Sequence, residues 1–529
     1  MKFYFKTFYY APVRVAAFKN QTYIINLLLN HKGIQFEKEL FKECYELTEI
    51  TIPPSITIIH EQTFKECRNL KRVNLPSTLT AIENEAFQDC KNLSEISIPS
   101  LVIKIGERAF MNCIIKQVSL SSLTTISKDC FKGCKQLDHI DIPSSVTSIE
   151  SGAFHGCSSL KVVSIPPSLK SIGKSAFAAC TSITDITIQS QITIIEDETF
   201  SKCTSLGHIT ISSQIVSIGK YAFNKCGIID FVIPSSVRSI GDYAFSDCSC
   251  LEKIAIPSSV TSIGDYSFQG CSSLKKVSIP SSVTAIGSGV FTKCSSLEEV
   301  DLPSSITELK GFSFAKCTSL KTIDIPSSVT TIKYNAFNLC SSLEKVTIPS
   351  SVKVIEDFCF EGCKKLTSAI ISAQITSISS SLFKDCSSLT EASLPSSVTS
   401  IGVNSFRECV ALKSITFPSS VTEIREYSFY GCSSLQVLSF PDSLALIGSN
   451  AFFGCSSLKE VSIPASVTAI NIGVFRKCTS LTKVTIPSSI TSIGSMAFEE
   501  CCSLSEVSLP SSTKIEKSSF PQNTKITKI

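Results

Sequence analysis

The stretch from Leu274 to Leu297, LKKVSIPSSVTAIGSGVFTKCSSL, holds one complete copy of the pattern that decides the fold. Its first part has apolar residues at Leu274, Val277 and Ile279 with polar residues between them, which is typical of a strand with one buried face. Pro280 cannot donate a hydrogen bond to a neighbouring strand. We therefore expect the strand to end at this proline.

The second part of the copy returns to the core. Val283 and Ile286 are apolar, and the β-branched Val283 favours a second short extended segment. Gly287 would permit a corner at which the φ angle is positive. A single helical turn is expected from Val290 to Cys294, because the next copy begins at Leu297 and leaves no room for a longer helix.

This pattern recurs through almost the whole chain, and its marker is a Phe followed three residues later by Cys. All steps between neighbouring markers are 23 residues long except those that end at Phe131 (21 residues), Phe245 (22) and Phe520 (22). A fixed period of roughly 20–50 residues is typical of stacked units that are each too small to bury their own apolar face. The sequence therefore predicts a β-rich solenoid of about 22 units, the number of marker Phe residues.

Stacking places equivalent strands about 4.8 Å apart, so one face should be a long parallel sheet. The rest of each unit has room only for short turns or a single helical turn, and we expect a gently curved arc with the marker Phe rings in a buried column. The predicted divisions are an N-terminal cap or tail (1–23), the solenoid (24–520) and a C-terminal cap (521–529).

The repeated unit I-P-x-x-[V/I]-x-x-I-x-x-x-A-F-x-x-C resembles the BspA-like, or Treponema-type, leucine-rich-repeat family over about residues 24–520. The resemblance implies a right-handed leucine-rich-repeat arc. It also implies an adhesion-type protein that is secreted or displayed at a cell surface, with a protein partner such as a host or matrix protein.

Composition excludes other classes of function. The chain contains no run of eighteen uncharged apolar residues, so no transmembrane segment is predicted. Its 49 basic and 45 acidic residues give a net charge of only +4, which is too little for a nucleic-acid-binding protein. Nucleotide-binding, hydrolase and metalloprotease motifs are absent from the sequence. We therefore expect no enzymatic activity and no cofactor.

The first twenty residues, MKFYFKTFYYAPVRVAAFKN, contain four basic residues, no acidic residue and seven aromatic residues. Their longest uncharged stretch, residues 7–13, is short for the core of a secretory signal and contains Pro12. We favour a structural cap over a cleaved signal or an organelle-targeting segment. Tyr23–Leu29 would then be a degenerate first strand.

The 25 cysteines form a column rather than an irregular disulfide framework. All but Cys130, Cys250, Cys359 and Cys502 follow a marker Phe. Because Asn523 takes the Cys position in the last copy, we expect these side chains to turn onto backbone groups as structural thiols. Some disulfides remain an alternative, whereas a metal site is not expected because its ligands must converge on one ion. Cys250 and Cys502 should be the most exposed.

Binding should use the outward positions of the strands. The best-defined local feature there is the acidic group Glu299, Asp301 and Asp324, flanked by Lys276 and Lys345. The alternative is that this face is merely solvated. Three corners, which end at Ile192, Ile215 and Ile375, read S-Q-I or A-Q-I in place of P-S-S-V, and the loss of Pro should extend the strand or kink the arc.

Two functions remain open at this point. The family resemblance favours an adhesion protein at a cell surface. The absence of a recognisable signal and the many unpaired thiols favour an intracellular scaffold or regulatory protein in a reducing, cytoplasmic compartment.

Overall fold

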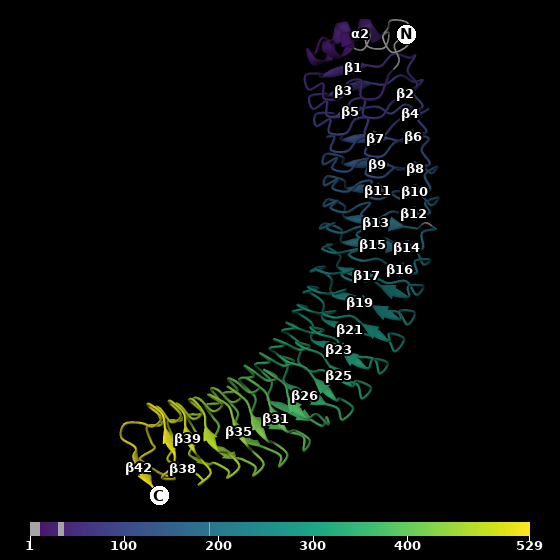
Figure 1. The fold of residues 1–529 in the computed structure, drawn as a ribbon. Coiled ribbons are helices and arrows are strands. Elements are labelled where there is room, and N and C mark those ends of the chain that lie inside the picture. Colours follow the sequence, from purple (N-terminus) through teal and green to yellow (C-terminus); the bar gives the residue numbers. More distant parts are fainter. Residues whose placement is uncertain (1–10, 30–35, 190) are drawn as a thin grey trace, which may run out of the picture. The chain divides into compact units, whose positions relative to one another are not determined.

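The computed structural model describes residues 11–29, 36–189 and 191–529, and the chain divides into two compact units, Met1–Val260 and Thr261–Ile529. The described residues form a parallel β-solenoid of about 21 turns, which confirms the predicted fold class. Most turns contribute one strand to each of two columns. In the N-terminal unit, β1, β3 and β5 lie along one side of the coil, and β2, β4 and β6 lie along the other (Figure 1).

The first column lies on the L-x-x-I-x-I segments. Its strands are β1 (Glu49–Thr51), β3 (Arg72–Asn74), β5 (Glu95–Ile96), β7 (Gln117–Ser119), β9 (His139–Asp141), β11 (Val162–Ser164), β13 (Asp185–Ile188), β15 (His208–Ile211), β17 (Asp230–Val232), β19 (Lys253–Ala255), β21 (Lys276–Ser278), β23 (Glu299–Asp301), β26 (Lys345–Ile348), β28 (Ser368–Ile371), β30 (Glu391–Ser393), β32 (Ser414–Thr416), β34 (Val437–Ser439), β36 (Glu460–Ser462), β38 (Lys483–Thr485), β40 (Glu506–Leu509) and β42 (Lys525–Lys528).

The second column consists of two-residue strands that follow each corner. They are β2 (Ile58–Ile59), β4 (Ala81–Ile82), β6 (Lys104–Ile105), β8 (Thr125–Ile126), β10 (Ser148–Ile149), β12 (Ser171–Ile172), β14 (Ile194–Ile195), β16 (Ser217–Ile218), β18 (Ser239–Ile240), β20 (Ser262–Ile263), β22 (Ala285–Ile286), β24 (Glu308–Leu309), β25 (Thr331–Ile332), β27 (Val354–Ile355), β29 (Ser377–Ile378), β31 (Ser400–Ile401), β33 (Glu423–Ile424), β35 (Leu446–Ile447), β37 (Ala469–Ile470), β39 (Ser492–Ile493) and β41 (Lys514–Ile515).

Neighbouring strands of a column pair in parallel, and each residue faces the equivalent residue of the next copy. Lys276 faces Glu299, for example, and Val277 faces Val300. At the three corners that end at Ile192, Ile215 and Ile375, which lack Pro, the first strand is longer, whereas β7 keeps three residues although Ser121 stands at the Pro position. The strands β13, β15 and β28 have four residues each, and the amide of Ser372 donates to the carbonyl of Ile348 at 3.0 Å. The predicted extension is confirmed, although β26 and β40 reach the same length before a Pro.

The predicted first strand at Tyr23–Leu29 is wrong. Residues 11–18 are helical, and α2 (Thr22–Leu29) is a second helix. Ile25 and Leu29 are buried and lie four residues apart, so they share one face of the helix. The first ten residues, which begin the predicted cap, lie outside the described residues, and the divisions at 23 and 520 stay predictions.

The predicted helical turn around the marker Phe is also wrong. In the copy that contains Phe291, Gly289 and Lys293 have φ angles of 60° and 63°, in the left-handed region. The amides of Gly289, Phe291 and Lys293 donate to carbonyls of the next copy at 2.8, 2.9 and 2.8 Å. An α-helix would direct such amides to its own preceding turn. This third side of the coil is therefore a further ladder between copies.

Gly287 serves a different purpose from the one the sequence suggested. Its φ angle is not positive, so no left-handed corner occurs at this residue. A Cβ atom at this position would lie 2.4 Å from the backbone nitrogen of Asp265 in the preceding turn. Glycine is required here because two turns of backbone approach closely.

The core is built from columns of identical side chains. The marker Phe residues from Phe41 to Phe498 are at most 1% exposed. Successive rings within each unit stack with centroids 5.0–5.7 Å apart, as in the 5.4 Å pair Phe314–Phe337. The inward orientation predicted for this column is confirmed.

The thiols form a second internal column. From Cys67 onward, the Sγ of a Cys that follows a marker Phe typically donates to the carbonyl oxygen of the Phe in the preceding copy, as Cys317 does to Phe291 at 3.1 Å. All 25 cysteines are free thiols, and only Cys250 and Cys502 are exposed, as predicted. The contact with backbone carbonyls is the one that the sequence suggested, but Asn523, from which it was inferred, is itself exposed. Side-chain hydroxyl groups form further hydrogen bonds between turns. Ser351, for example, donates to the carbonyl of Val329 at 2.8 Å.

Candidate binding face

Within each unit, the outward side chains of the first-column strands form an exposed surface, called here the first-column face. Alternation along the strand creates it: in β21, Lys276 and Ser278 point outward, whereas Val277 is 1% exposed. The inward side chains pack into the core. The outward ones make few backbone contacts, so their chemistry is available to a ligand.

The structure brings together three of the five predicted site residues. The ammonium nitrogen of Lys276 lies 2.9 Å from Oε1 of Glu299 and 3.9 Å from Oδ2 of Asp301. These side chains are each more than half exposed, and the hydrogen bond to Glu299 raises the pKa of Lys276. Asp324 is exposed in a segment with no assigned strand, and Lys345 begins β26. Neither forms an ion pair with another described residue.

In-register pairing explains why charges on this face neutralise one another. Residues 23 positions apart lie side by side, so the guanidinium of Arg72 pairs with Glu95 at 2.6 Å and Lys321 pairs with Glu298 at 3.1 Å. Exposed ion pairs contribute about 0–1 kcal/mol each. They set the local charge of the face more than its stability.

We describe four grooves on the first-column face. One has a volume of about 930 Å³ and lies across β3, β5 and β7. Three others, of about 570, 550 and 360 Å³, lie across strands β28–β32, β34–β38 and β11–β13. None of the four is lined by the five predicted site residues.

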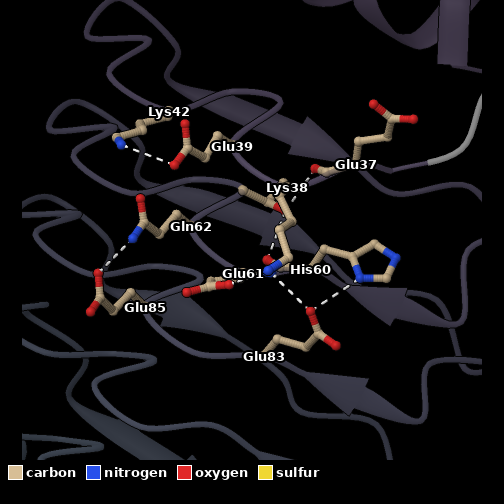
Figure 2. Close-up of polar contacts among 10 residues, drawn as sticks. Glu37, Lys38, Glu39, Lys42, His60, Glu61, Gln62, Glu83 and Glu85 are labelled. Carbon is tan, nitrogen blue, oxygen red and sulfur yellow. Dashed lines mark hydrogen bonds and ion pairs between the residues drawn. The ribbon is translucent and has the colours of Figure 1, made fainter. Parts of the chain in front are cut away.

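A separate polar cluster lies near the N-terminal end of the solenoid (Figure 2). Nδ1 of His60 lies 3.1 Å from Oε2 of Glu83, which also accepts from the amide of Glu61. Lys38 forms an ion pair with Glu61, and the side-chain amide of Gln62 donates to Oε2 of Glu85 at 3.0 Å. The partners come from successive turns, so this cluster ties turns together, although Oε1 of Gln62 is buried without a hydrogen-bond partner.

Sequence reasoning missed several aromatic groups on the third side of the coil, two of which are described here. Phe312 and Tyr334 make an edge-on contact with centroids 5.2 Å apart. Tyr430 and Phe453 stack at 4.4 Å, and the guanidinium of Arg407 lies 4.7 Å from the Tyr430 ring. The sequence did contain a signal for the second group. Arg407, Tyr430 and Phe453 each come directly after a marker Phe, so stacking places them side by side.

Among the described residues, no group of three or more His, Cys, Asp or Glu residues is arranged to hold a metal ion. No helix in the described part of the chain combines the length and the apolar character needed to cross a membrane.

Comparison with known proteins agrees with this geometry. The profile of the BspA type leucine rich repeat region matches residues 13–138, 124–252, 216–341, 310–436 and 399–527, which together cover nearly the whole chain. The chain belongs to the BspA-type leucine-rich-repeat family. No curated protein matches this BspA-type chain.

Solved structures of bacterial leucine-rich-repeat proteins are similar to this BspA-type protein. One from Bacteroides ovatus is 29% identical with a TM-score of 0.52, and the match covers 83% of this chain and 92% of that one. A leucine rich cell surface protein from Faecalibacterium prausnitzii is also 29% identical, over 61% of this chain and 87% of that one, with a TM-score of 0.37. One from Eubacterium ventriosum is 27% identical over 52% and 83%, with a TM-score of 0.40. The family and the first of these structures support the same solenoid fold.

Proposed function

We propose that this protein is a non-enzymatic binding protein of the adhesion type, displayed at a cell surface, that holds a protein partner on its first-column face. One observation carries the proposal. The Phe, Cys, Ser and Thr columns contact neighbouring turns, whereas the outward side chains of successive first-column strands are exposed along both units. Leucine-rich-repeat families commonly serve as protein-interaction scaffolds, and the BspA-type resemblance supplies the surface setting.

Within this face, Glu299, Asp301 and Asp324, with Lys276 and Lys345 beside them, are the proposed contact patch. The two acidic residues that Lys276 pairs remain more than half exposed, and Asp324 has no ion-pair partner among the described residues. A partner with a basic surface would meet exposed carboxylates on two neighbouring turns. Glu299 and Asp301 lie on the first, and Asp324 lies on the next.

The test compares a surface change with a core change. Changing Glu299, Asp301 and Asp324 together to Ser should leave the unfolding midpoint nearly unchanged, since exposed substitutions usually alter stability by about 0.5 kcal/mol or less each. Phe314→Ala removes a ring that is 1% exposed and should cost about 3–5 kcal/mol. We expect the triple variant to lose binding to intact cells and to immobilised matrix proteins while it remains folded.

The opposite pattern would count against the patch. If the triple variant binds like the unchanged protein and only Phe314→Ala weakens binding, then these carboxylates are a solvated surface. In that case binding depends on the integrity of the array and not on this group.

An intracellular scaffold is the second candidate, and the buried free thiols favour it. Burial raises the pKa of Cys294 and Cys340 to about 12, and all 25 cysteines are unpaired, which suits a reducing compartment. Labelling of intact and permeabilised cells with a membrane-impermeant reagent separates the candidates. Labelling of intact cells supports the surface proposal, and labelling that requires permeabilisation supports the scaffold.

A further inference from the structure

The groove across β3, β5 and β7, lined by residues between Arg72 and Asp138, has features that the other three described grooves lack. Its volume is about 930 Å³, within the usual range of ligand sites. Val73 and Ile96 contribute apolar surface, and Arg72, Glu95 and Gln117 contribute polar groups. It lies entirely within the N-terminal unit.

The groove coincides with a shortened copy of the repeat. Only one residue separates Cys113 from Ile115, where a regular copy has two residues between its Cys and the buried Leu. Ile115 is nevertheless fully buried. The backbone therefore takes a shorter path from the corner to β7. Lys116, directly before β7, and Gln117, its first residue, both line the groove.

Asp138 supplies an acceptor that the protein itself leaves unused. Its Oδ1 atom is buried and has no hydrogen-bond partner. Lys116 and Lys161 occupy the equivalent position in the preceding and following copies, with backbone hydrogen bonds to Asp138, yet neither ammonium pairs with its carboxylate. A buried acceptor without a partner carries a desolvation cost that a ligand donor would remove.

Lys116 supplies the complementary group. It lines the same groove one turn before Asp138, is exposed, and forms no ion pair with a described residue. Arg72 and Glu95, by contrast, are already joined by hydrogen bonds of 3.0 and 2.6 Å. The groove therefore offers one unpaired negative group and one unpaired positive group on adjacent turns, about 4.8 Å apart along the axis.

We propose that this groove binds an extended peptide segment of a protein partner, with a basic side chain on Asp138 and an acidic side chain on Lys116. The proposal rests on the proposed function and names the ligand of one part of the same face. In an extended chain, side chains two residues apart lie on one side at about 6.6 Å, a spacing that long side chains adapt to the two groups. No aromatic ring lines the groove, so it lacks the flat apolar surface on which sugar rings stack.

The test uses the full-length protein and fluorescein-labelled hexapeptide libraries, measured by fluorescence anisotropy. Two libraries have an acidic and a basic residue two positions apart in either order, one has two acidic residues and one has two basic residues, with all other positions mixed. We expect at least one mixed-charge library to bind, and both like-charge libraries to bind about fivefold or more weakly by comparison.

Variants connect binding to the groove. Asp138→Asn should weaken mixed-charge binding about tenfold, because it removes the charged partner of the basic side chain. Glu252→Gln is the matched control, since Glu252 occupies the same position of its copy, is exposed and lies outside the groove, and it should bind like the unchanged protein. Asp138→Lys should shift preference to the doubly acidic library. Unchanged thermal midpoints would establish that the variants are folded.

Equal binding of all four libraries, binding that Asp138→Asn does not weaken, or no peptide binding would overturn the proposal. Chito- or cello-oligosaccharide binding that is lost in Asp138→Asn would also overturn it and assign the groove to a glycan. The proposed function has a separate readout. If Asp138→Asn still binds cells while the Glu299, Asp301 and Asp324 triple variant does not, the face binds a partner without this groove.

Discussion

A residue's column decides what its side chain does in this protein. After the first copy, a Cys that follows a marker Phe is buried and typically donates its S–H to the Phe carbonyl one copy earlier, as in Cys294 to Phe268 at 3.1 Å. Burial raises the pKa of this thiol to about 12, so almost none of it is thiolate at neutral pH. Because thiolate is the reactive form, these cysteines should be inert in the folded protein.

Thiol counting tests this at the residue scale. In the native protein we expect a thiol reagent to modify Cys250 and Cys502, the two exposed cysteines, and to reach the other thiols only after guanidinium is added. Replacing both exposed cysteines with Ser should abolish the native reaction. Rapid native modification of many more thiols, or a native protein with nearly all cysteines oxidised, would contradict the structure.

The elements show which features a sequence pattern can predict. The strands follow from apolar alternation and from Pro280, and β21 (Lys276–Ser278) lies inside the predicted segment. The turn beside Phe291 could not be predicted. Lys293 is an ordinary L-residue, and it adopts the left-handed conformation because backbone hydrogen bonds to the next copy hold it there. Such bonds depend on stacking, which no single copy displays.

The candidate site was predictable only in part, for a related reason. Outward positions follow from alternation, so the exposure of Glu299 and Asp301 could be predicted, and in-register stacking places Lys276 beside them. The groove near Asp138 depends on the path of a shortened copy and on neighbouring side chains. Nothing in the identity of Asp138 indicates that one of its oxygens is buried without a partner.

Substituting glycines tests the close approach of neighbouring turns. Gly287→Ala would place a Cβ atom 2.4 Å from the backbone nitrogen of Asp265, so the turns must move apart and we expect a loss of stability of about 1–3 kcal/mol. Gly207→Ala is the control, because the nearest atom to its added Cβ lies 4.0 Å away. Guanidinium unfolding of both variants gives the comparison. Equal midpoints would show that the turns are not in such close contact at Gly287.

For the whole molecule, the thiol column makes stability sensitive to alkaline pH. The buried thiols of Cys203, Cys248, Cys294, Cys340 and Cys359 have pKa values raised to about 12, mainly by burial. A thiol in the unfolded chain has a pKa of about 8.5. Because the folded pKa is higher, the stability from each thiol is fully present below the unfolded pKa and is lost as pH rises toward the folded value.

We therefore expect guanidinium midpoints, measured under reducing conditions, to fall steeply above about pH 9. Each such thiol costs about 1.4 kcal/mol of folding free energy per pH unit in that range. The double variant Cys294→Ala/Cys340→Ala should show a shallower dependence, and Ser at Cys250 and Cys502 should leave the dependence unchanged. A dependence that is the same in all three proteins would rule out the thiol column as its source.

The first-column face is the proposed recognition surface. Site-specific photo-cross-linking on cells tests it most directly, with the cross-linking residue placed at Gln117 or Lys276 on this face, at the exposed Thr330 beside the second column, or at the exposed Lys316 on the third side. We predict adducts with one protein partner from Gln117 and Lys276 and none from Thr330 or Lys316. Equal adducts from all four positions, or adducts from Thr330 or Lys316 alone, would contradict recognition of the partner by the first-column face.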